Sequence, residues 1–257
     1  MKAVDPTIKI VPNGNTAEWW QTVLTKTSGY IDDICVSNYP VSVCDTVKNL
    51  TGPADIALES IKKYTSPENQ KRFRVIVAEY GPFSWCNNAG ATFVNTMYNN
   101  LVNIQIGFQW LQDPGVIFSY FWNTRWINDG GGKYSSFDAL DKNGYFNANG
   151  YGLMILGKFL GNKMIKTIAG NELKTYASID DKQNKLYLYA INNSNTPITI
   201  HTDFKNRGAK SISSIFELIG KSADDTKLLW TEIKALPSGT RQVIKPFSIR
   251  VLVYWLQ

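Results

Sequence analysis

Four short apolar segments, each followed by a segment of helical composition, fill the first 164 residues of this 257-residue chain. The apolar segments lie at 8–11, 31–36, 74–79 and 116–122, and the helical ones lie near 16–28, 53–65, 88–101 and 147–160. Strands and helices that alternate in this way form parallel sheets with right-handed crossovers. The pattern therefore predicts a parallel α/β unit.

The remaining residues, 165–257, show a different pattern. Short strand-like segments such as KLYLYAI and SIRVLVYWL are separated by turn sequences such as NNSN and LPSG. This pattern is typical of an antiparallel β-sandwich, and we expect the domain boundary near 162–168. Because a closed eight-stranded barrel needs about 250 residues, four strand–helix units are either a complete open sheet or half of a barrel.

The composition argues against several classes of function. The net charge is +6, but the Lys and Arg residues are scattered, so we expect no nucleic-acid partner. His201 is the only histidine, and the strand-like segment TPITIHTDF around it predicts an ordinary residue. A Ser–His or Cys–His catalytic unit and most zinc sites are therefore not expected. Chemistry in this chain must rest on carboxylates, amides and aromatic side chains.

The sequence gives few signals of location. No apolar run reaches the roughly 18–20 residues of a membrane helix, and the opening MKAVDPTIKI has no apolar signal segment. We expect no membrane partner, and secretion only if a signal lies upstream in a longer chain. Cys35, Cys44 and Cys86 show no CxxC spacing. A Cys35–Cys44 disulfide is one interpretation, and buried free thiols are the favoured one.

A carboxylate ends the third apolar segment, in the sequence FRVIVAEYGP of residues 73–82. A lone charge is very costly to bury, so Glu79 must be solvated or paired. The carboxyl ends of parallel strands are also where ligands bind in α/β sheets and barrels. Glu79 is therefore either ion-paired at the rim of the sheet or a catalytic carboxylate.

The order of these segments resembles strands five to eight of the clan-A glycoside hydrolases, which are retaining (β/α)8-barrel enzymes. The arabinofuranosidase, xylosidase and agarase-like members are the most similar. KAVDPTIKI resembles the approach to strand five, IDDICVSNYP strand six, RVIVAEYGP strand seven and IFSYFWNTRW strand eight. ALDKNGYFNANGYGLMILGKFLGNKMIKT resembles the passage from the last barrel helix into their β-sandwich. The resemblance implies the C-terminal half of a TIM barrel over 1–164 and an antiparallel β-sandwich over 165–257.

The resemblance also implies roles for individual residues. Glu79 occupies the position of the nucleophile, and Tyr39 matches a tyrosine similar to its hydrogen-bond donor. In a retaining glycosidase one carboxylate attacks the anomeric carbon, and a second, about 5–5.5 Å away, protonates the leaving oxygen. Amides bind sugar hydroxyls and aromatic rings stack on sugar C–H faces, which makes these residues substrate-binding candidates: Asn38, Tyr39, Trp85, Trp122, Asn123 and Trp126. The remaining tryptophans singled out, Trp19, Trp20, Trp230 and Trp255, are expected to pack.

The second carboxylate is missing from its expected place. The family carries it in an Asn–Glu pair at the end of strand four, whereas here Asn171–Glu172 falls at the start of the sandwich. The chain is then expected to be a fragment whose acid/base precedes Met1, with an N-terminal half barrel supplied by another chain as a possible partner. If the acid lies in this chain, the candidates are Asp113, Asp129 and Asp138. Ser37 also stands where the family often carries a His, so the resemblance does not define which sugar is bound.

These observations favour a retaining glycoside hydrolase that acts on a plant or algal polysaccharide. It would need no cofactor and no metal, because two carboxylates suffice. A non-catalytic carbohydrate-binding protein with a degenerate glycosidase cleft is the alternative, favoured by the missing Asn–Glu pair. A purely structural α/β domain with a sandwich is the third possibility.

Overall fold

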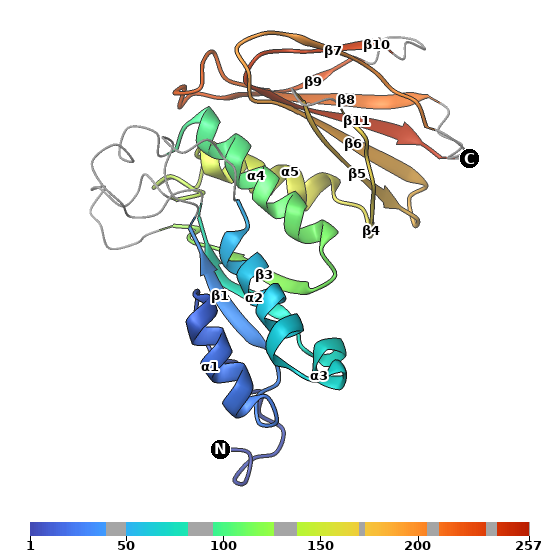
Figure 1. The fold of residues 1–257 in the computed structure, drawn as a ribbon. Coiled ribbons are helices and arrows are strands. Elements are labelled where there is room, and N and C mark those ends of the chain that lie inside the picture. The colour runs from blue at the N-terminus through green and yellow to red at the C-terminus, as the bar shows by residue number, and fades with distance from the viewer. Residues whose placement is uncertain are drawn as a thin grey trace. The chain divides into compact units, whose positions relative to one another are not determined.

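A computed structural model describes residues 1–39, 50–81, 95–125, 138–169, 173–204, 211–234 and 241–256 of the chain. The chain divides into two compact units (Figure 1). The first unit contains Met1–Cys86 and Gln109–Trp122, and the second contains Asn87–Phe108 and Asn123–Gln257. This division does not test the domain boundary expected between residues 164 and 165, which stays a prediction.

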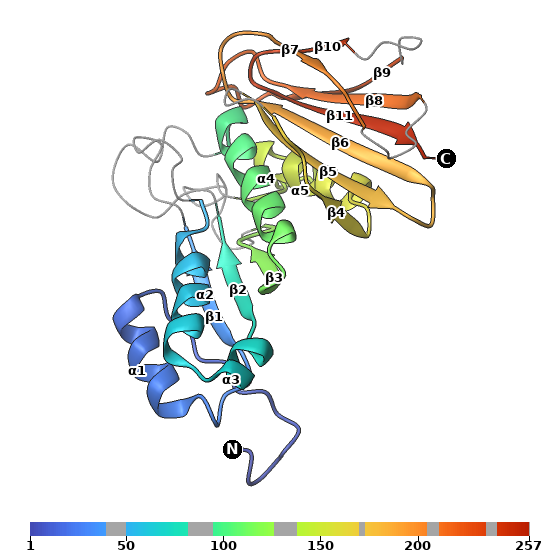
Figure 2. The same cartoon turned by 45° about the vertical axis from the view of Figure 1, so that its right-hand side comes forward.

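The first unit is built on a three-stranded parallel sheet in the order β1-β2-β3. Its strands and helices are β1 (Ile34–Asn38), β2 (Val75–Tyr80), β3 (Val116–Phe121), α1 (Ala17–Thr27), α2 (Gly52–Tyr64) and α3 (Pro67–Arg72). Helix α2 packs on β1 and β2, as Figure 2 shows. Ile34, Val36, Val75 and Val77 are completely buried. Three of the predicted strands and their parallel pairing are therefore confirmed.

The prediction of a strand at 8–11 is wrong. This segment runs beside β1, where the Asp32 N–H donates to Ile10 O (2.9 Å) and the Cys35 N–H donates to Pro12 O (2.9 Å). A single parallel bridge, Asn13 to Cys35, follows. Proline has no N–H to donate, so Pro12 cannot complete a ladder of hydrogen bonds.

Capping residues mark the starts of two helices in the first unit. The Thr16 hydroxyl accepts the Trp19 N–H at the start of α1 (3.3 Å), and the Ser66 hydroxyl accepts the Asn69 N–H at the start of α3 (3.4 Å). Side chains of this kind satisfy N–H groups that have no partner inside the helix. The helices expected near 16–28 and 53–65 are confirmed, while α3 was not expected.

The fourth helix, α4 (Met97–Gln112), differs from the prediction. It was expected near 88–101, of which 88–94 lie outside the described residues. The described helix continues eleven residues past the expected end. Residues 101–108 are buried on every side of the helix. Over these residues the helix has no exposed face, and buried polar residues such as Asn103 and Gln105 interrupt the apolar pattern that would predict it.

The second unit contains antiparallel strands, as predicted from its short strand-like segments and the turn sequences between them. A six-stranded sheet has the order β4-β5-β6-β11-β8-β9, and β10 pairs with β7 in a second sheet. His201 ends β7 as an exposed residue paired with Arg241. The elements are α5 (Ala148–Phe159), β4 (Lys163–Ile165), β5 (Lys174–Asp180), β6 (Lys185–Asn192), β7 (Ile198–His201), β8 (Ile212–Ile219), β9 (Leu229–Ile233), β10 (Arg241–Ile244) and β11 (Ser248–Trp255).

Alternation along β6 divides the core of this unit. Tyr187 and Tyr189 belong to the cluster that includes α5 and the start of α4, whereas Leu186 and Leu188 face the opposite side of the sheet. Phe108 of α4 stacks on Tyr176 of β5 with a centroid separation of 4.6 Å. One face of the six-stranded sheet is thus covered by helices. No helix in the described part of the chain is long and apolar enough to cross a membrane.

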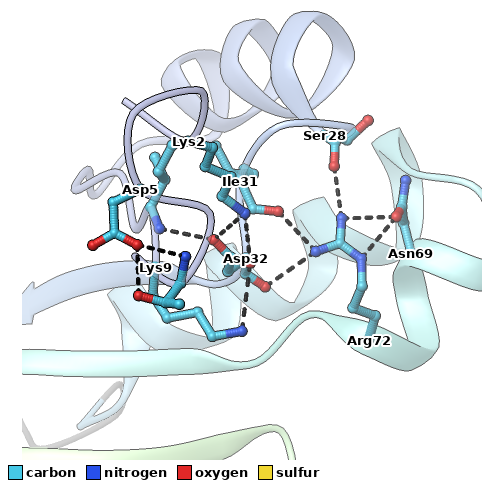
Figure 3. Close-up of polar contacts among 10 residues, drawn as sticks. Lys2, Asp5, Lys9, Ser28, Ile31, Asp32, Asn69 and Arg72 are labelled. Atoms are coloured by element: carbon cyan, nitrogen blue, oxygen red, sulfur yellow. Dashed lines mark hydrogen bonds and ion pairs between the residues drawn. The ribbon is translucent and has the colours of Figure 1, made fainter.

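Asp32 ties the segment before α1 to the start of β1 (Figure 3). Its carboxylate lies 2.7 Å from Lys2 Nζ and 3.6 Å from Lys9 Nζ, and it accepts the Ile10 N–H (2.8 Å). Arg72 of α3 donates to the neighbouring carbonyl of Ile31 (2.7 Å). Together these contacts hold the amino end of the sheet.

We predict that this carboxylate makes the stability of the chain depend on pH. The hydrogen bond from Lys2, followed by that from the Ile10 N–H, lowers the pKa of Asp32 from 3.8 to about 2. A lowered pKa adds stability above pH 3.8 that is lost as the pH falls through about 2. Urea unfolding at several pH values in this window should show that the free energy of unfolding falls less with decreasing pH for Asp32→Asn than for the wild type. Asp203→Asn, an exposed change of equal charge in the second unit, should behave like the wild type.

Candidate active site

One extra residue near the end of β2 decides the direction of Glu79. Val36 of β1 pairs with Val77, but the next residue, Ser37, pairs with Glu79, so Ala78 is left without a counterpart. The pairing with β3 shifts over the same stretch of β2. Such a β-bulge interrupts the alternation of side chains and is common next to active sites.

Because of the bulge, Glu79 lies on the opposite face of the sheet from Val77, and Tyr80 returns to the buried face. Tyr80 is buried, with its ring 4.9 Å from that of Trp110 and 5.5 Å from that of Phe121. Glu79 lies on the open face together with Ile76 and is half-buried. Its carboxylate therefore stays within reach of a ligand at the carboxyl end of the central strand.

Tyr39 follows β1 directly and hydrogen-bonds to Glu79. Burial, and then the nearby Glu79 carboxylate, raise the pKa of the Tyr39 hydroxyl well above its usual value. The phenol therefore stays protonated and donates its hydrogen to the carboxylate.

Trp122, just after β3, is the third residue that lies near Glu79 and Tyr39. Its ring meets that of Tyr39 edge-on, with centroids 6.4 Å apart and planes at 82°. Gly81 lies between them: a Cβ there would be 3.1 Å from Tyr39 Cε1 and 3.3 Å from Trp122 O. The structure thus brings Glu79, Tyr39 and Trp122 together at the carboxyl end of the sheet.

Asn38 does not face this group, contrary to the prediction that it binds substrate. It is completely buried, and its Nδ2 donates to Leu50 O just before α2 (2.8 Å). Alternation along β1 places Asn38 on the same face as Ile34 and Val36. Its side chain therefore fixes the end of the strand instead of facing a ligand.

The remaining binding candidates are not gathered in the described site. Trp85 and Trp126 lie outside the described residues. Asn123 follows Trp122 in the chain but belongs to the second unit, where its backbone O accepts the Ala139 N–H (3.1 Å). The roles of these three residues stay predictions.

Asp113 is excluded as the acid/base partner of Glu79. It precedes β3, where its Oδ1 accepts the Gly115 N–H (2.8 Å), so it lies at the amino end of the sheet. A six-residue strand spans about 20 Å, far more than the 5–5.5 Å of a retaining pair. Asp129 is outside the described residues, and Asp138 is buried in the second unit.

Cys35, on the open face of β1, is a free and half-buried thiol, as the favoured interpretation predicts for this residue. Its Sγ accepts a hydrogen bond from Asn13 Nδ2 (3.2 Å), and burial raises the pKa of the thiol. Cys44 and Cys86 lie outside the described residues. In the described ranges, no three His, Cys, Asp or Glu residues are grouped so that they could hold a metal ion.

The two neighbouring tryptophans of α1 differ from each other. Trp20 is completely buried, as predicted, but Trp19 is 47% exposed, contrary to the prediction that it packs. Trp20 and Leu24 are four residues apart and share the buried face of the helix. Trp19 is turned about 100° from Trp20, so helical periodicity could have predicted its exposure.

Comparisons with known proteins give a fold but no close relative. No protein-family model and no curated protein match this sequence. A solved structure of the α-L-arabinofuranosidase from Thermotoga maritima is similar over 99% of this chain and 59% of its own, with 16% identity and a TM-score of 0.77. The β-xylosidase from Caulobacter crescentus CB15 is similar over 99% of this chain and 63% of its own, with 10% identity and a TM-score of 0.66.

A third structure, BuGH86 in complex with neoagarooctaose, is similar over 100% of this chain and 45% of its own, with 12% identity and a TM-score of 0.66. At such identities the similarity establishes the fold alone. The chain spans less than two thirds of the length of each of these three structures. The resemblance to clan-A glycoside hydrolases that the sequence predicts is therefore confirmed at the level of the fold.

Proposed function

We propose that this chain is part of a retaining glycoside hydrolase and that Glu79 is its nucleophile. The proposal rests on the half-buried Glu79 carboxylate at the end of the central strand, to which the Tyr39 hydroxyl hydrogen-bonds. A hydrogen bond from a phenol to a carboxylate oxygen holds the carboxylate in one orientation. A charged carboxylate is what attack on an anomeric carbon requires.

In the proposed reaction the Glu79 carboxylate forms a bond to the anomeric carbon as the glycosidic C–O bond breaks. A second carboxylic acid gives its proton to the leaving oxygen. Water then cleaves the glycosyl ester, restoring Glu79 and retaining the configuration of the sugar. Tyr39 orients the nucleophile, and the half-buried ring of Trp122 is a platform for the sugar.

We further propose that residues 1–164 are half of a barrel, followed by a C-terminal β-sandwich. The open face of the parallel sheet supports this interpretation. Phe118 and Tyr120 of β3 are each 56% exposed, with stacked rings 6.4 Å apart. Large apolar side chains fill the interior of a closed barrel. The remaining strands of the barrel, from a longer polypeptide or another chain, would cover this face and supply the acid/base.

The substrate proposed is a plant or algal polysaccharide. The similar structures are named as an arabinofuranosidase, a xylosidase and a protein bound to neoagarooctaose. Arabinose, xylose and agarose units are therefore the sugars to test first.

The test of the nucleophile is covalent labelling of the 257-residue chain by 2,4-dinitrophenyl 2-deoxy-2-fluoro-glycosides of arabinofuranose and xylose. Their leaving group needs little help from an acid, so a lone nucleophile should form a stable glycosyl ester. Mass spectrometry should find one sugar per chain on the peptide with Glu79. Glu79→Gln should remain unlabelled, while Glu59→Gln, an exposed change on α2, should label normally. A label on another carboxylate, or none, would refute this assignment.

Tyr39→Phe should slow this labelling about 10- to 100-fold, because a hydrogen bond to a charged group contributes about 1.5–3 kcal/mol. Tyr30→Phe is the matched control, since Tyr30 is 73% exposed. Equal labelling rates for the two variants would remove Tyr39 from the mechanism.

A non-catalytic carbohydrate-binding protein is the second candidate. The observation that favours it comes from the sequence, where the only Asn–Glu pair, Asn171–Glu172, falls at the start of the predicted sandwich. A protein of this kind would bind oligosaccharides but would not react with the fluoro-glycosides.

A further inference from the structure

A second set of side chains lies at the same edge of the parallel sheet as Glu79. Asn13 forms a parallel bridge with Cys35, and Asn15 Oδ1 accepts the Ser37 N–H (3.0 Å). Ser37 in turn pairs with Glu79. Asn15 is thus two strand spacings, about 10 Å, from Glu79 across the sheet, a distance that a short oligosaccharide can span.

The ring of Trp19 packs against this segment at Gly14. The Thr16 hydroxyl caps α1 through the Trp19 N–H, and the burial of Trp20 turns Trp19 outward. The indole lies directly against Gly14, where a Cβ would be 1.9 Å from Trp19 Cδ1 and 2.2 Å from Nε1. Only glycine leaves room for the ring in this position, while 47% of Trp19 stays exposed.

The chemistry of this group suits a sugar ring. An exposed indole offers an apolar surface to sugar C–H groups, and its N–H is a hydrogen-bond donor. Asn13 and Asn15, the neighbours of Gly14 in the chain, are both exposed, and their amide groups contact Cys35 Sγ and the Ser37 N–H of β1.

We propose that Trp19, supported by Gly14 and flanked by Asn13 and Asn15, binds a sugar ring at a subsite beside Glu79. This inference rests on the proposed function, because it takes the polysaccharide as the ligand. It adds a second contact that would direct the polymer across the carboxyl end of β1. Trp19 binds substrate here and takes no part in bond breaking.

The first test is calorimetric titration of the 257-residue chain with arabinohexaose, xylohexaose and neoagarohexaose. Trp19→Ala should weaken binding of the preferred sugar about tenfold, as expected for the loss of an aromatic ring that stacks on a ring of the ligand. The control is Trp255→Ala, because Trp255 is 46% exposed in the second unit and lies under Lys185. This control should bind like the wild type.

The second test keeps the indole but moves it. Gly14 does not have a positive φ, so Gly14→Ala is compatible with the backbone, and its main clash is with Trp19. We expect Gly14→Ala to lose affinity to about the same extent as Trp19→Ala. Circular dichroism should confirm that both variants keep their fold.

Wild-type affinity in both variants, or no binding of any of the three sugars by the wild type, would overturn the subsite. A loss of affinity in Trp255→Ala equal to that in Trp19→Ala would also overturn the subsite. Labelling of Glu79 by the fluoro-glycosides is read separately and does not depend on Trp19. The proposed function can therefore survive when the subsite fails, and the two outcomes are distinguishable.

Discussion

In the Glu79→Ala variant, azide is expected to restore release of dinitrophenolate from an activated aryl glycoside and to give a glycosyl azide of inverted configuration. Without azide, the rate of the initial burst should fall by about 10⁴-fold or more, as for the loss of other covalent nucleophiles. Alanine leaves space beside Tyr39, and azide can attack the anomeric carbon from the side that the carboxylate occupied. Stopped-flow absorbance gives the rate, and NMR of the product gives its configuration.

Glu59→Ala, on the exposed side of α2, is the control and should keep the wild-type burst. A glycosyl azide of retained configuration would instead assign Glu79 to the acid/base role. Loss of the burst without any rescue, in a variant that keeps its fold, would contradict a role as nucleophile.

The largest effect on stability is expected from Phe108→Ala. Phe108 is completely buried and lies between the rings of Tyr176 (4.6 Å) and Tyr189 (4.4 Å), so it joins α4 to the antiparallel sheet. Truncation of a buried phenylalanine leaves a cavity and costs about 3–5 kcal/mol. Urea unfolding followed by circular dichroism should show this loss in the free energy of unfolding of the second unit.

Leu111→Ala provides the comparison on the same helix, because Leu111 is 43% exposed. Its free energy of unfolding should stay within about 0.5 kcal/mol of the wild type. Equal losses for the two variants would mean that the stacked aromatic group does not hold α4 on the sheet.

The elements that could be predicted from the sequence are those with a regular pattern. The apolar runs of β1 and β2, the helical composition of α1 and α2, and the short strand-like segment of β6 each reflect a local requirement of the backbone. The positions of Glu79, Tyr39 and Trp122 followed from strand ends, because parallel strands present their carboxyl ends at one edge.

The features that could not be predicted lie where the backbone is irregular or where an element is buried on every side. The bulge at Ala78 has no residue signature, since alanine is compatible with a regular strand. The interior of α4 carries no amphipathic pattern, because residues 101–108 are buried all round. Asn38 was assigned from its position next to Tyr39, although the alternation along β1 already placed it on the buried face.

The bulge in β2 means that the length of this strand matters as much as its composition. In a regular strand Val75, Val77 and Glu79 would share one face, so the carboxylate would enter the buried layer. A strand one residue shorter would keep Glu79 on the open face but would end about 3.3 Å earlier, further from Tyr39. The extra residue therefore extends the strand by one step without turning the carboxylate over. Related chains should be aligned here by their cross-strand partners, with a gap at Ala78 where a relative lacks the extra residue.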